Sequence, residues 1–401
     1  MKILQICKKV PWPLHDGEAI AVYAMAKGLA LQGNEVSLLA MNTIKHEKQE
    51  ASISNHLNYY SSVRFVSVDN RIGVKGIFSN LLLSRNPIHV DRLISDDFEG
   101  ELISVVQETN FDIILMETIF SSHCLDTLRL VSNSKLIIRN HNVEHLIWKR
   151  LSNLLPTWKS WYYHSQAHRL KRYEKRQLEK ADLIIPLSVE DERGIRDIGV
   201  KTKSKVVPIG LDLDDYKIQD SVDERDIFKI CFIGSLDWEP NLQGLSWFID
   251  EVWSRVNSSN LKNRVELHIA GKHMPNRLRE LSLNGIVIHQ EVSDAISFIN
   301  NHSAMIVPLF AGSGQRVKIL QALALGKIVL SSTIGIEGIH AENERHFLKC
   351  NTKEDFFKGI EEIVDGKIVL SKSNIREKVQ THYDLIELGK QVNKALQKII
   401  D

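Results

Sequence analysis

Short, continuous apolar runs alternate with longer stretches of helical periodicity along almost the whole chain. In the first half these runs occupy 2–6, 36–41, 111–117, 135–141 and 182–188. A strand that is apolar at every position has to be covered on both faces, which is typical of a parallel sheet with helices on each side. Between the first two runs, 18–32 has helical periodicity, and Gly33 and Asn34 follow it as a predicted helix end.

The same alternation restarts in the second half. Its apolar runs occupy 228–234, 265–271, 286–290, 303–310 and 327–333. The segment between the two series, 211–226, is acidic and poor in apolar residues, so we interpret it as a linker. Two βαβ series predict an α/β protein of two Rossmann-like domains, 1–212 and 227–375, that face a cleft. A single large doubly wound sheet is the alternative, which the polar linker disfavours. The charged helical stretch at 376–401 can pack on either domain.

Length and charge narrow the class of protein. The chain has 401 residues, enough for two domains, with 51 Lys and Arg against 50 Asp and Glu, so its overall charge gives no reason to expect binding to nucleic acid. The apolar runs fall short of the ~18–20 residues of a membrane span, and Lys8 and Lys9 interrupt the first run too early for a signal peptide. The four cysteines have neither disulfide nor metal-site spacing: Cys7, Cys124, Cys231 and Cys350. We therefore expect a cytoplasmic protein and exclude secreted, fibrous and integral-membrane classes.

Polar residues crowd the end of the strand predicted at 135–141, where ligands of open parallel sheets bind. Arg139, His141, Asn142 and Glu144 fall close together there. An imidazole with a reference pKa near ~6.5 can hydrogen-bond a sugar hydroxyl or shuttle a proton. A lone histidine is more often structural, but the amide and carboxylate beside it favour a functional site. The spacing of these residues does not make a zinc site, because three convergent ligands are not evident among them.

The turn after the first strand, 8–19, contains Pro11, Pro13 and Gly17. It lacks the GxGxxG spacing of dinucleotide sites, which counts against NAD or FAD. Two interpretations stay open: a proline-rich loop, or a glycine turn that lets the backbone approach a ligand.

The strongest motif is the glycine-rich turn Gly312, Ser313, Gly314 between a buried strand and an amphipathic helix. Free N–H groups and the positive end of a helix dipole favour phosphate at such a turn. Arg316 and Lys318 follow in the first turns, where the dipole disfavours positive charge, so a bound anion would explain them. The alternative is a flexible turn with two solvated cations. A second glycine-rich turn, 334–339, follows the next strand at the same edge and includes Glu337.

The second domain opens with another loop at a strand end. Gly234 and Ser235 end the strand at 228–234, and Trp238 is a candidate aromatic wall for a sugar or base.

In this order, the segments of the chain resemble the retaining glycosyltransferases of family 4, a large family with two Rossmann-type domains (the GT-B fold). The similarity is carried by 16–39, 139–144, 173–191, 206–212, 234–241, 312–327 and 335–339. It implies a nucleotide-sugar donor held mainly by the C-terminal domain, an acceptor on the N-terminal domain, and retention at the anomeric carbon. It also implies that the terminal helix, 376–401, packs back on the first domain.

The resemblance assigns roles to single residues. Gly17 matches the loop near the donor phosphates, and His141 matches the histidine that contacts the transferred sugar. Val292, after the third strand of the second series, is a candidate for a position beside the base. The donor-binding candidates are Gly17, Gly234, Ser235, Val292, Gly312, Ser313, Gly314, Gln321 and Glu337, and the acceptor-side candidates are Asp16, Asn142 and Glu144.

The chain also departs from the family. Ser313 and Gln321 stand where the family carries two glutamates, of which the second holds the ribose hydroxyls. Ser235 and Pro240 stand where many members carry an arginine and a lysine. Arg316 and Lys318 are the nearest replacements to neutralise the diphosphate, and with His141 they are the catalytic candidates.

The implied activity is retaining, metal-independent transfer of a hexosyl or N-acetylhexosaminyl group to a glycan or lipid-linked acceptor in surface polysaccharide biosynthesis. The nucleotide sugar is then a co-substrate, and neither a cofactor nor a metal is expected. A nucleotide-sugar epimerase on the same fold is one alternative. A non-catalytic nucleotide-sugar-binding protein is the other, because both expected glutamates are missing.

Residues 148–180 combine aromatic and basic side chains. Such a stretch can lie on an anionic membrane, which would suit a lipid-linked acceptor and peripheral attachment at the inner face of the membrane. A solvated helix with its aromatic residues packed inward, and with Glu174 and Glu179 pairing across turns, is the slightly favoured alternative.

Overall fold

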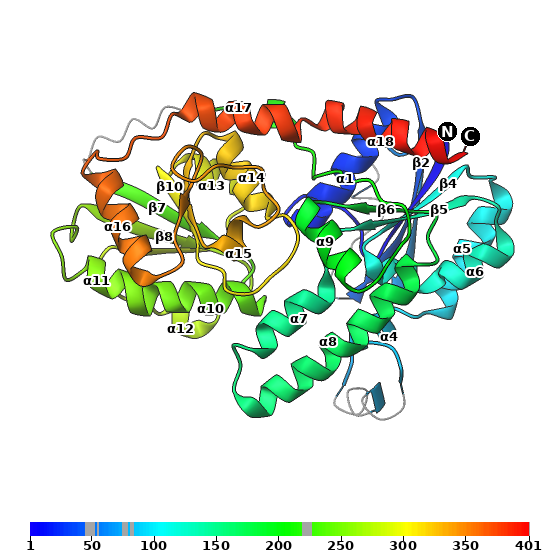
Figure 1. Ribbon diagram of the computed structural model, residues 1–401, viewed down its shortest axis with the longest axis horizontal. Coiled ribbons are helices and arrows are strands. Elements are labelled where there is room, and N and C mark those ends of the chain that lie inside the picture. Colours follow the sequence, from blue (N-terminus) through cyan, green and yellow to red (C-terminus); the bar gives the residue numbers. More distant parts are fainter. Residues whose placement is uncertain (45–52, 54–55, 74–78, 81–83, 219–226, 401) are drawn as a thin grey trace. The chain divides into compact units, whose positions relative to one another are not determined.

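The computed structural model describes residues 1–401 except 45–52, 54–55, 74–78, 81–83, 219–226 and 401 (Figure 1). The chain divides into two compact units. The first comprises Met1–Gly210, Ser313–Gln315 and Leu385–Asp401, and the second comprises Leu211–Gly312 and Arg316–Asp384.

A six-stranded parallel sheet forms the centre of the first unit, in the order β3-β2-β1-β4-β5-β6. Its strands are β1 (Lys2–Cys7), β2 (Glu35–Thr43), β3 (Ser62–Val68), β4 (Ile113–Glu117), β5 (Lys135–Asn140) and β6 (Leu183–Pro186). The apolar runs predicted at 111–117, 135–141 and 182–188 form β4, β5 and β6, which are buried at nearly every position, as cover on both faces requires. The sequence reading missed β3, because this edge strand is half-buried and alternates with polar residues.

Helices connect these strands and cover the sheet. They are α1 (Gly17–Ala30), α4 (Ile88–Asp91), α5 (Asp96–Glu108), the 3₁₀ helix η3 (Ile119–Cys124), α6 (Leu125–Val131), α7 (Glu144–Ser152), α8 (Thr157–Leu178), α9 (Val189–Asp197) and α18 (Leu385–Ile400). Helix α1 begins after Asp16, whose carboxylate accepts the N–H groups of Glu18 and Ala19 as an N-cap. It ends before Gly33, which has a φ of +78° as expected after a helix.

A second six-stranded parallel sheet runs through the second unit, in the order β12-β11-β10-β7-β8-β9. Its strands are β7 (Phe228–Ile233), β8 (Val265–Ala270), β9 (Ile286–Gln290), β10 (Ala304–Val307), β11 (Ile328–Ser331) and β12 (Leu348–Lys349). Counted from the first strand of each unit, both orders are 3-2-1-4-5-6, the Rossmann order. The predicted fold class of two Rossmann-like domains is confirmed.

The helices of the second unit are again distributed along a βα alternation. They are η4 (Leu213–Asp215), α10 (Glu239–Trp247), the π-helical turn η5 (Phe248–Trp253), α11 (Ser254–Val256), α12 (Asn276–Arg279), α13 (Ala295–Asn300), α14 (Val317–Ala324), α15 (Thr333–Ile336), α16 (Lys353–Val364) and α17 (Lys372–Tyr383). Phe248 and Trp253 are fully buried in the core of this unit.

The predicted linker and terminal helix differ from what the sequence suggested. Residues 211–218 of the linker belong to the second unit, and 219–226 lie outside the described residues. The terminal stretch predicted as one helix is two, α17 in the second unit and α18 in the first. The break is at Asp384, where ψ is 122° and the preceding carbonyl of Tyr383 accepts the N–H of Leu211. An extended residue bonded to another segment cannot continue a helical ladder.

Helix α18 packs on α1, and both are visible side by side in Figure 1. Its buried face carries Leu388, Val392 and Leu396. The two helices approach closely at Gly28 and Gly389: a Cβ added to Gly389 would lie 2.7 Å from the Gly28 carbonyl oxygen. Because that neighbour is backbone, the helices would have to separate to admit a side chain.

No helix in the part of the chain that the structure describes is both long enough and apolar enough to cross a membrane.

Substituting Gly389→Ala should lower the free energy of unfolding by about 1–3 kcal/mol, because the methyl group overpacks the α1–α18 contact. Urea unfolding followed by circular dichroism measures the effect. Gly100→Ala is the matched control: Gly100 lies in α5 with nothing within 4 Å of an added Cβ, so this change should stabilise by about 0.5–1 kcal/mol. Equal effects of the two substitutions would contradict the close approach.

Candidate functional site

In the first unit, His141 lies at the end of β5 beside Glu117 at the end of the neighbouring strand β4. His141 Nε2 is 2.6 Å from Glu117 Oε2, and both side chains are buried. Arg139 Nη1 donates to the same carboxylate oxygen at 3.2 Å, and Gln5 Nε2, from β1, donates to Oε1 at 2.6 Å. Three adjacent strands thus bring four polar side chains together near the carboxyl end of the sheet.

The charge on Glu117 sets the state of the histidine. Burial by itself raises the pKa of Glu117, but Arg139 and the hydrogen bond from His141 lower it below its usual value, so the group is a carboxylate. A carboxylate at Nε2 accepts the proton of that nitrogen. In the neutral imidazole the lone pair is then on Nδ1, which can accept a proton or a hydroxyl hydrogen bond. Glu117 therefore orients the predicted residue His141 and fixes its tautomer.

The first-strand turn holds two ion pairs. Lys8 Nζ lies 3.0 Å from Glu18 Oε2, and Lys9 Nζ lies 2.7 Å from Asp16 Oδ1. Burial opposes ionisation of Glu18, but the cations of Lys8 and Lys9 overcome it and lower its pKa to about 2. Asp16, predicted on the acceptor side, serves locally as the α1 N-cap and as the partner of Lys9. Gly17 is the first residue of that helix.

Beyond β5, Asn142 and Glu144 form a pair. Asn142 Nδ2 donates to Glu144 Oε1 at 2.9 Å. Burial raises the pKa of Glu144 to about 7, because its environment penalises the charged form. Glu174, from α8, accepts the N–H of Glu144 at 2.6 Å and also bonds the ring of His145. The predicted across-turn pairing holds for Glu179 with Lys175 but not for Glu174, which is buried and faces α7.

In the second unit, Lys318 of α14 reaches the end of β7. Its Nζ donates to the Ile233 carbonyl oxygen at 2.8 Å and lies 3.5 Å from Asn241 Oδ1. A Cβ on Gly234 would be 2.5 Å from Nζ, so glycine is what admits the ammonium there. Burial first, and the neighbouring Arg316 second, lower the pKa of Lys318 to about 8. A bound anion would stabilise the protonated form of Lys318 against burial and against the repulsion from Arg316.

Arg316 is the N-cap residue of α14 and lies against Gly312. Its Nη2 donates to the Ile334 carbonyl oxygen at 3.0 Å. Ile334 lies in α15, which follows β11 and precedes Glu337 in the chain. A Cβ on Gly312, which has a φ of +148°, would lie 2.5 Å from Nη2. The two predicted cations and two predicted glycines therefore cluster at the strand ends next to the start of α14.

Part of the glycine-rich turn is placed differently from the prediction. Ser313, Gly314 and Gln315 group with the first unit. Ser313 Oγ and the Gly314 N–H both donate to Asp191 Oδ1, each at 3.2 Å. This carboxylate takes the N–H that we expected to face a phosphate. Helix α14 begins at Val317, after this turn.

The remaining donor candidates lie on separate loops of the second unit. Gln321 is buried and its Nε2 donates to Tyr216 Oη at 3.2 Å. Ser235 Oγ donates to its neighbour Asp237 at 2.6 Å, and Trp238 is 42% exposed as the N-cap of α10. Val292 follows β9, the edge strand, and is half-buried.

Glu117, Gln5 and Glu174 were not found by sequence reasoning. Each lies in an element that reads as ordinary core or surface, and its partner is distant in sequence. The available signal was a charged residue inside an apolar strand: Glu117 is the last residue of β4 and 1% exposed. A buried charge of this kind requires a partner.

As the pH rises, the wild type should lose stability relative to Glu144→Gln. A carboxyl with a raised pKa contributes stability below about pH 4.5 and loses it as the pH passes through about 7. From pH 5 to pH 8 we expect the difference in unfolding free energy to move by about 2–3 kcal/mol in favour of the variant. Urea unfolding of both proteins across this range measures it, and a difference independent of pH would show that Glu144 titrates normally.

Residues 16–215 match the family described as Glycosyltransferase Family 4, and residues 227–365 match Glycosyl transferases group 1. An uncharacterised 44.6 kDa protein of the cps region of Klebsiella pneumoniae is 25% identical over 375 residues, covering 90% of each chain. The structure of a sucrose-phosphate synthase from Thermosynechococcus elongatus superposes with a TM-score of 0.76 at 14% identity, covering 100% of this chain and 99% of that one. The Anabaena protein HepE in complex with UDP-glucose gives 0.69 at 15% identity, covering 99% and 100%.

Proposed function

This chain belongs to the group 1 glycosyltransferases of family 4, with the two Rossmann-like domains of the GT-B type, and on this basis we propose that it is a retaining enzyme that uses a nucleotide-diphosphate sugar. The observation that carries the proposal is the position of Lys318. Its ammonium lies against Gly234 at the end of β7, in the loop where the family's usual arginine and lysine are replaced by Ser235 and Pro240. A helix residue thus supplies the cation that the loop lacks.

The diphosphate binds, in this proposal, beside the start of α14 in the second unit. Lys318 and Arg316 provide two cations, and the first N–H groups of α14 provide donors and the positive end of its dipole. Burial and the neighbouring Arg316 make the charge on Lys318 costly without a ligand, as its lowered pKa indicates. An anion between them removes that cost.

The second unit also supplies groups for the rest of the donor. Gln321 donates through Nε2 to Tyr216, so its Oε1 is the atom suited to accept a ribose hydroxyl. We propose Val292, which follows β9, for the base, and Glu337, in the second glycine-rich turn, as a further donor-binding group.

Cleavage of the sugar–phosphate bond develops negative charge on the diphosphate and oxocarbenium character on the sugar. Fixed cations stabilise the leaving diphosphate as its charge grows, without a metal. His141, oriented by Glu117, presents Nδ1 to a hydroxyl of the transferred sugar. Attack from the face of the departing phosphate gives retention, which the anomeric configuration of the product tests by NMR.

A glycan or lipid-linked molecule is the proposed acceptor, in cytoplasmic assembly of a surface polysaccharide. The relative encoded in the cps region of Klebsiella pneumoniae supports this context. Asn142 and Glu144 at the end of β5 are the acceptor-side residues. Glu144, with a pKa near 7, can exchange a proton with an acceptor hydroxyl at neutral pH.

A lipid-linked acceptor would require contact with a membrane surface, and we propose that α7 and α8 make it. These helices form a hairpin in Figure 1. Leu154 and Trp161 near its tip are 47% and 65% exposed, and the basic residues Lys171 and Arg172 are exposed further along α8. Arg169, by contrast, is bound to the carbonyl oxygens of Asn80 and Ser84, so it has a structural role.

Donor binding is tested with Lys318→Met and Arg316→Met against a panel of UDP-, GDP-, ADP- and dTDP-sugars. A bound donor raises the melting temperature of the wild type. Each substitution should weaken binding of the preferred donor about 10–100-fold, since it removes a charge-assisted hydrogen bond. Transfer by the wild type should persist in EDTA.

The matched control is Lys353→Met, which removes a cation of the same unit that pairs with Glu251 on the surface. It should bind the donor as the wild type does. If the Lys318 and Arg316 variants also bind normally, the diphosphate site is elsewhere. Conversion of the donor without acceptor would favour the epimerase, and binding without release of nucleoside diphosphate would favour the non-catalytic protein.

Membrane contact is tested by sedimentation with vesicles of phosphatidylglycerol and phosphatidylethanolamine at low salt. The double charge reversal of Lys171 and Arg172 to Glu should weaken binding at least about 10-fold, because each nearby cation contributes about 1 kcal/mol. The control reverses Lys394 and Lys398, which are exposed on α18 of the same unit. Wild-type protein that stays in the supernatant, or equal losses in both variants, would reject the hairpin as the contact.

A further inference from the structure

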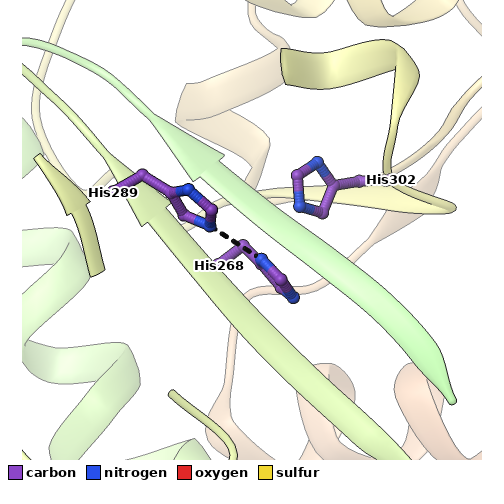
Figure 2. Close-up of side chains that lie close together, drawn as sticks. All are labelled: His268, His289 and His302. Atoms are coloured by element: carbon purple, nitrogen blue, oxygen red, sulfur yellow. Dashed lines mark hydrogen bonds between the residues drawn. The ribbon is translucent and has the colours of Figure 1, made fainter. Parts of the chain in front are cut away.

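Three histidines, none of them assigned to sugar transfer, gather in the second unit (Figure 2). His268 lies on β8, His289 on the neighbouring edge strand β9, and His302 follows α13 directly before β10. One ring nitrogen from each lies within 4.8 Å of the others. The rings of His268 and His302 belong to buried residues, whereas His289 is exposed. The cluster is therefore held by the core on two sides and open to solvent on the third.

Strand pairing explains why the first two rings meet. The register of β8 and β9 changes between Ile269 and Ala270, which pair with Ile288 and Gln290, so His289 is the extra residue of a bulge. Bulges redirect side chains. The His289 Nε2 atom consequently lies 2.8 Å from His268 Nδ1, the contact drawn as a dashed line in Figure 2.

Partners outside the cluster orient two of the rings. His302 Nδ1 donates to the Phe298 carbonyl oxygen at 2.6 Å, which leaves the lone pair on Nε2. His268 Nε2 lies 3.2 Å from a carboxylate oxygen of Glu266, two residues earlier on β8. That carboxylate holds the proton on Nε2 and leaves the lone pair on Nδ1, which faces His289. A carbonyl or a carboxylate behind the ligating imidazole is the usual arrangement at protein metal sites.

The rings are also in the state that a metal needs. Burial lowers the pKa of all three histidines, to about 4 for His302, so each is neutral at pH 7. Lys229 nearby adds to the lowering for His268 and His302, while Glu266 opposes it for His268. Neutral imidazoles offer their lone pairs without first losing a proton.

Ring stacking by itself is the alternative account of the cluster. The centroids of His268 and His289 are 5.1 Å apart at an interplanar angle of 23°, and those of His268 and His302 are 4.5 Å apart. Stacking, however, does not require lone pairs of two oriented rings to face the same space. Nor does it require polar imidazoles where phenyl rings would pack at lower desolvation cost.

We propose that His268, His289 and His302 form a binding site for one divalent late first-row transition-metal ion, with Zn²⁺ as the preferred physiological occupant. The ligands are His268 Nδ1, His289 Nε2 and His302 Nε2, and a water completes the coordination. Three nitrogen ligands match Zn²⁺, Ni²⁺ or Cu²⁺ and discriminate against Mg²⁺ and Ca²⁺, which take oxygen ligands. Zinc displaces the hydrogen bond between His268 and His289, and the proton of His289 moves to Nδ1.

The ion would connect the paired strands β8 and β9 to the turn before β10, a strand that β7 separates from β8 in the sheet. It would fasten the edge strand β9 to β8 and both to the turn before β10. The expected role is structural, because the ligands include none of the residues proposed for donor binding or transfer. The proposed metal site is therefore independent of the proposed glycosyl transfer, and each can be tested without the other.

The test uses the full-length protein, without an affinity tag of histidines and stripped of metal with EDTA. Calorimetric titration with Zn²⁺ should show saturable binding of one ion per chain, and Mg²⁺ should give no binding. His289→Asn should weaken Zn²⁺ binding at least about 10-fold. Because His289 is exposed, this variant keeps the fold, whereas substitution of the buried His302 tests the same ligand set at greater risk to stability.

Co²⁺ provides a second readout, since its visible absorption reports nitrogen coordination in a four- or five-coordinate site. The bands should appear with the wild type and disappear with His289→Asn. The matched control is His273→Asn, which removes an exposed imidazole of the same unit at a φ of +53° that asparagine tolerates. Absence of stoichiometric Zn²⁺ binding by the wild type, or equal binding by all variants, would overturn the proposal and leave stacking as the role of the cluster.

Discussion

Strands that are apolar on both faces leave polar chemistry almost no place except their ends. In both units the central strands are buried along their length, so helices must cover the two faces and charged side chains are displaced to the carboxyl edge. Parallel pairing then brings the ends of neighbouring strands together. His141 meets Glu117 for this reason, and Lys318 finds the end of β7.

Charged side chains at the carboxyl ends of the strands are stabilised differently in the two sheets. At the edge of the first sheet, the Glu117 carboxylate is surrounded by the donors of Arg139, Gln5 and His141, which stabilise it in its ionised form. At the carboxyl end of the second sheet, the half-buried Lys318 is bonded to neutral oxygens and repelled by Arg316. The Glu117 carboxylate therefore needs no further ligand, and it orients the imidazole of His141. The arrangement at Lys318 is improved by an anion, which is what a nucleoside diphosphate supplies.

The histidine cluster follows a third pattern. Here a backbone carbonyl and a carboxylate orient the neutral rings of His302 and His268, and the lone pairs of these two rings face the same space. The diphosphate site is rich in cations and suits an anion, whereas the cluster is uncharged and suits a cation. An anion and a cation that bind to one Rossmann-like unit require separate environments. The proposed anion site lies at α14, which follows the inner strand β10, whereas the histidine cluster includes the edge strand β9.

The sequence by itself determined the elements and the family of this protein. Continuous apolar runs identify the central strands, because burial on both faces is a local requirement of composition. The glycines beside Arg316 and Lys318 and the histidine after β5 are also legible locally. The half-exposed β3 was not, nor was the helix break at Asp384, which results from a bond between Tyr383 and Leu211.

Only the tertiary structure decided which side chains meet. The contacts of His141 with Glu117 and of Lys318 with Ile233 join residues 24 and 85 positions apart, and the Gly314 N–H is taken by Asp191, 123 positions away. The histidine cluster likewise depends on a bulge in strand pairing, which no local pattern announces. The register of the strands and the distances between packed helices determine these contacts. Both depend on the packing of the whole unit rather than on neighbours in the chain.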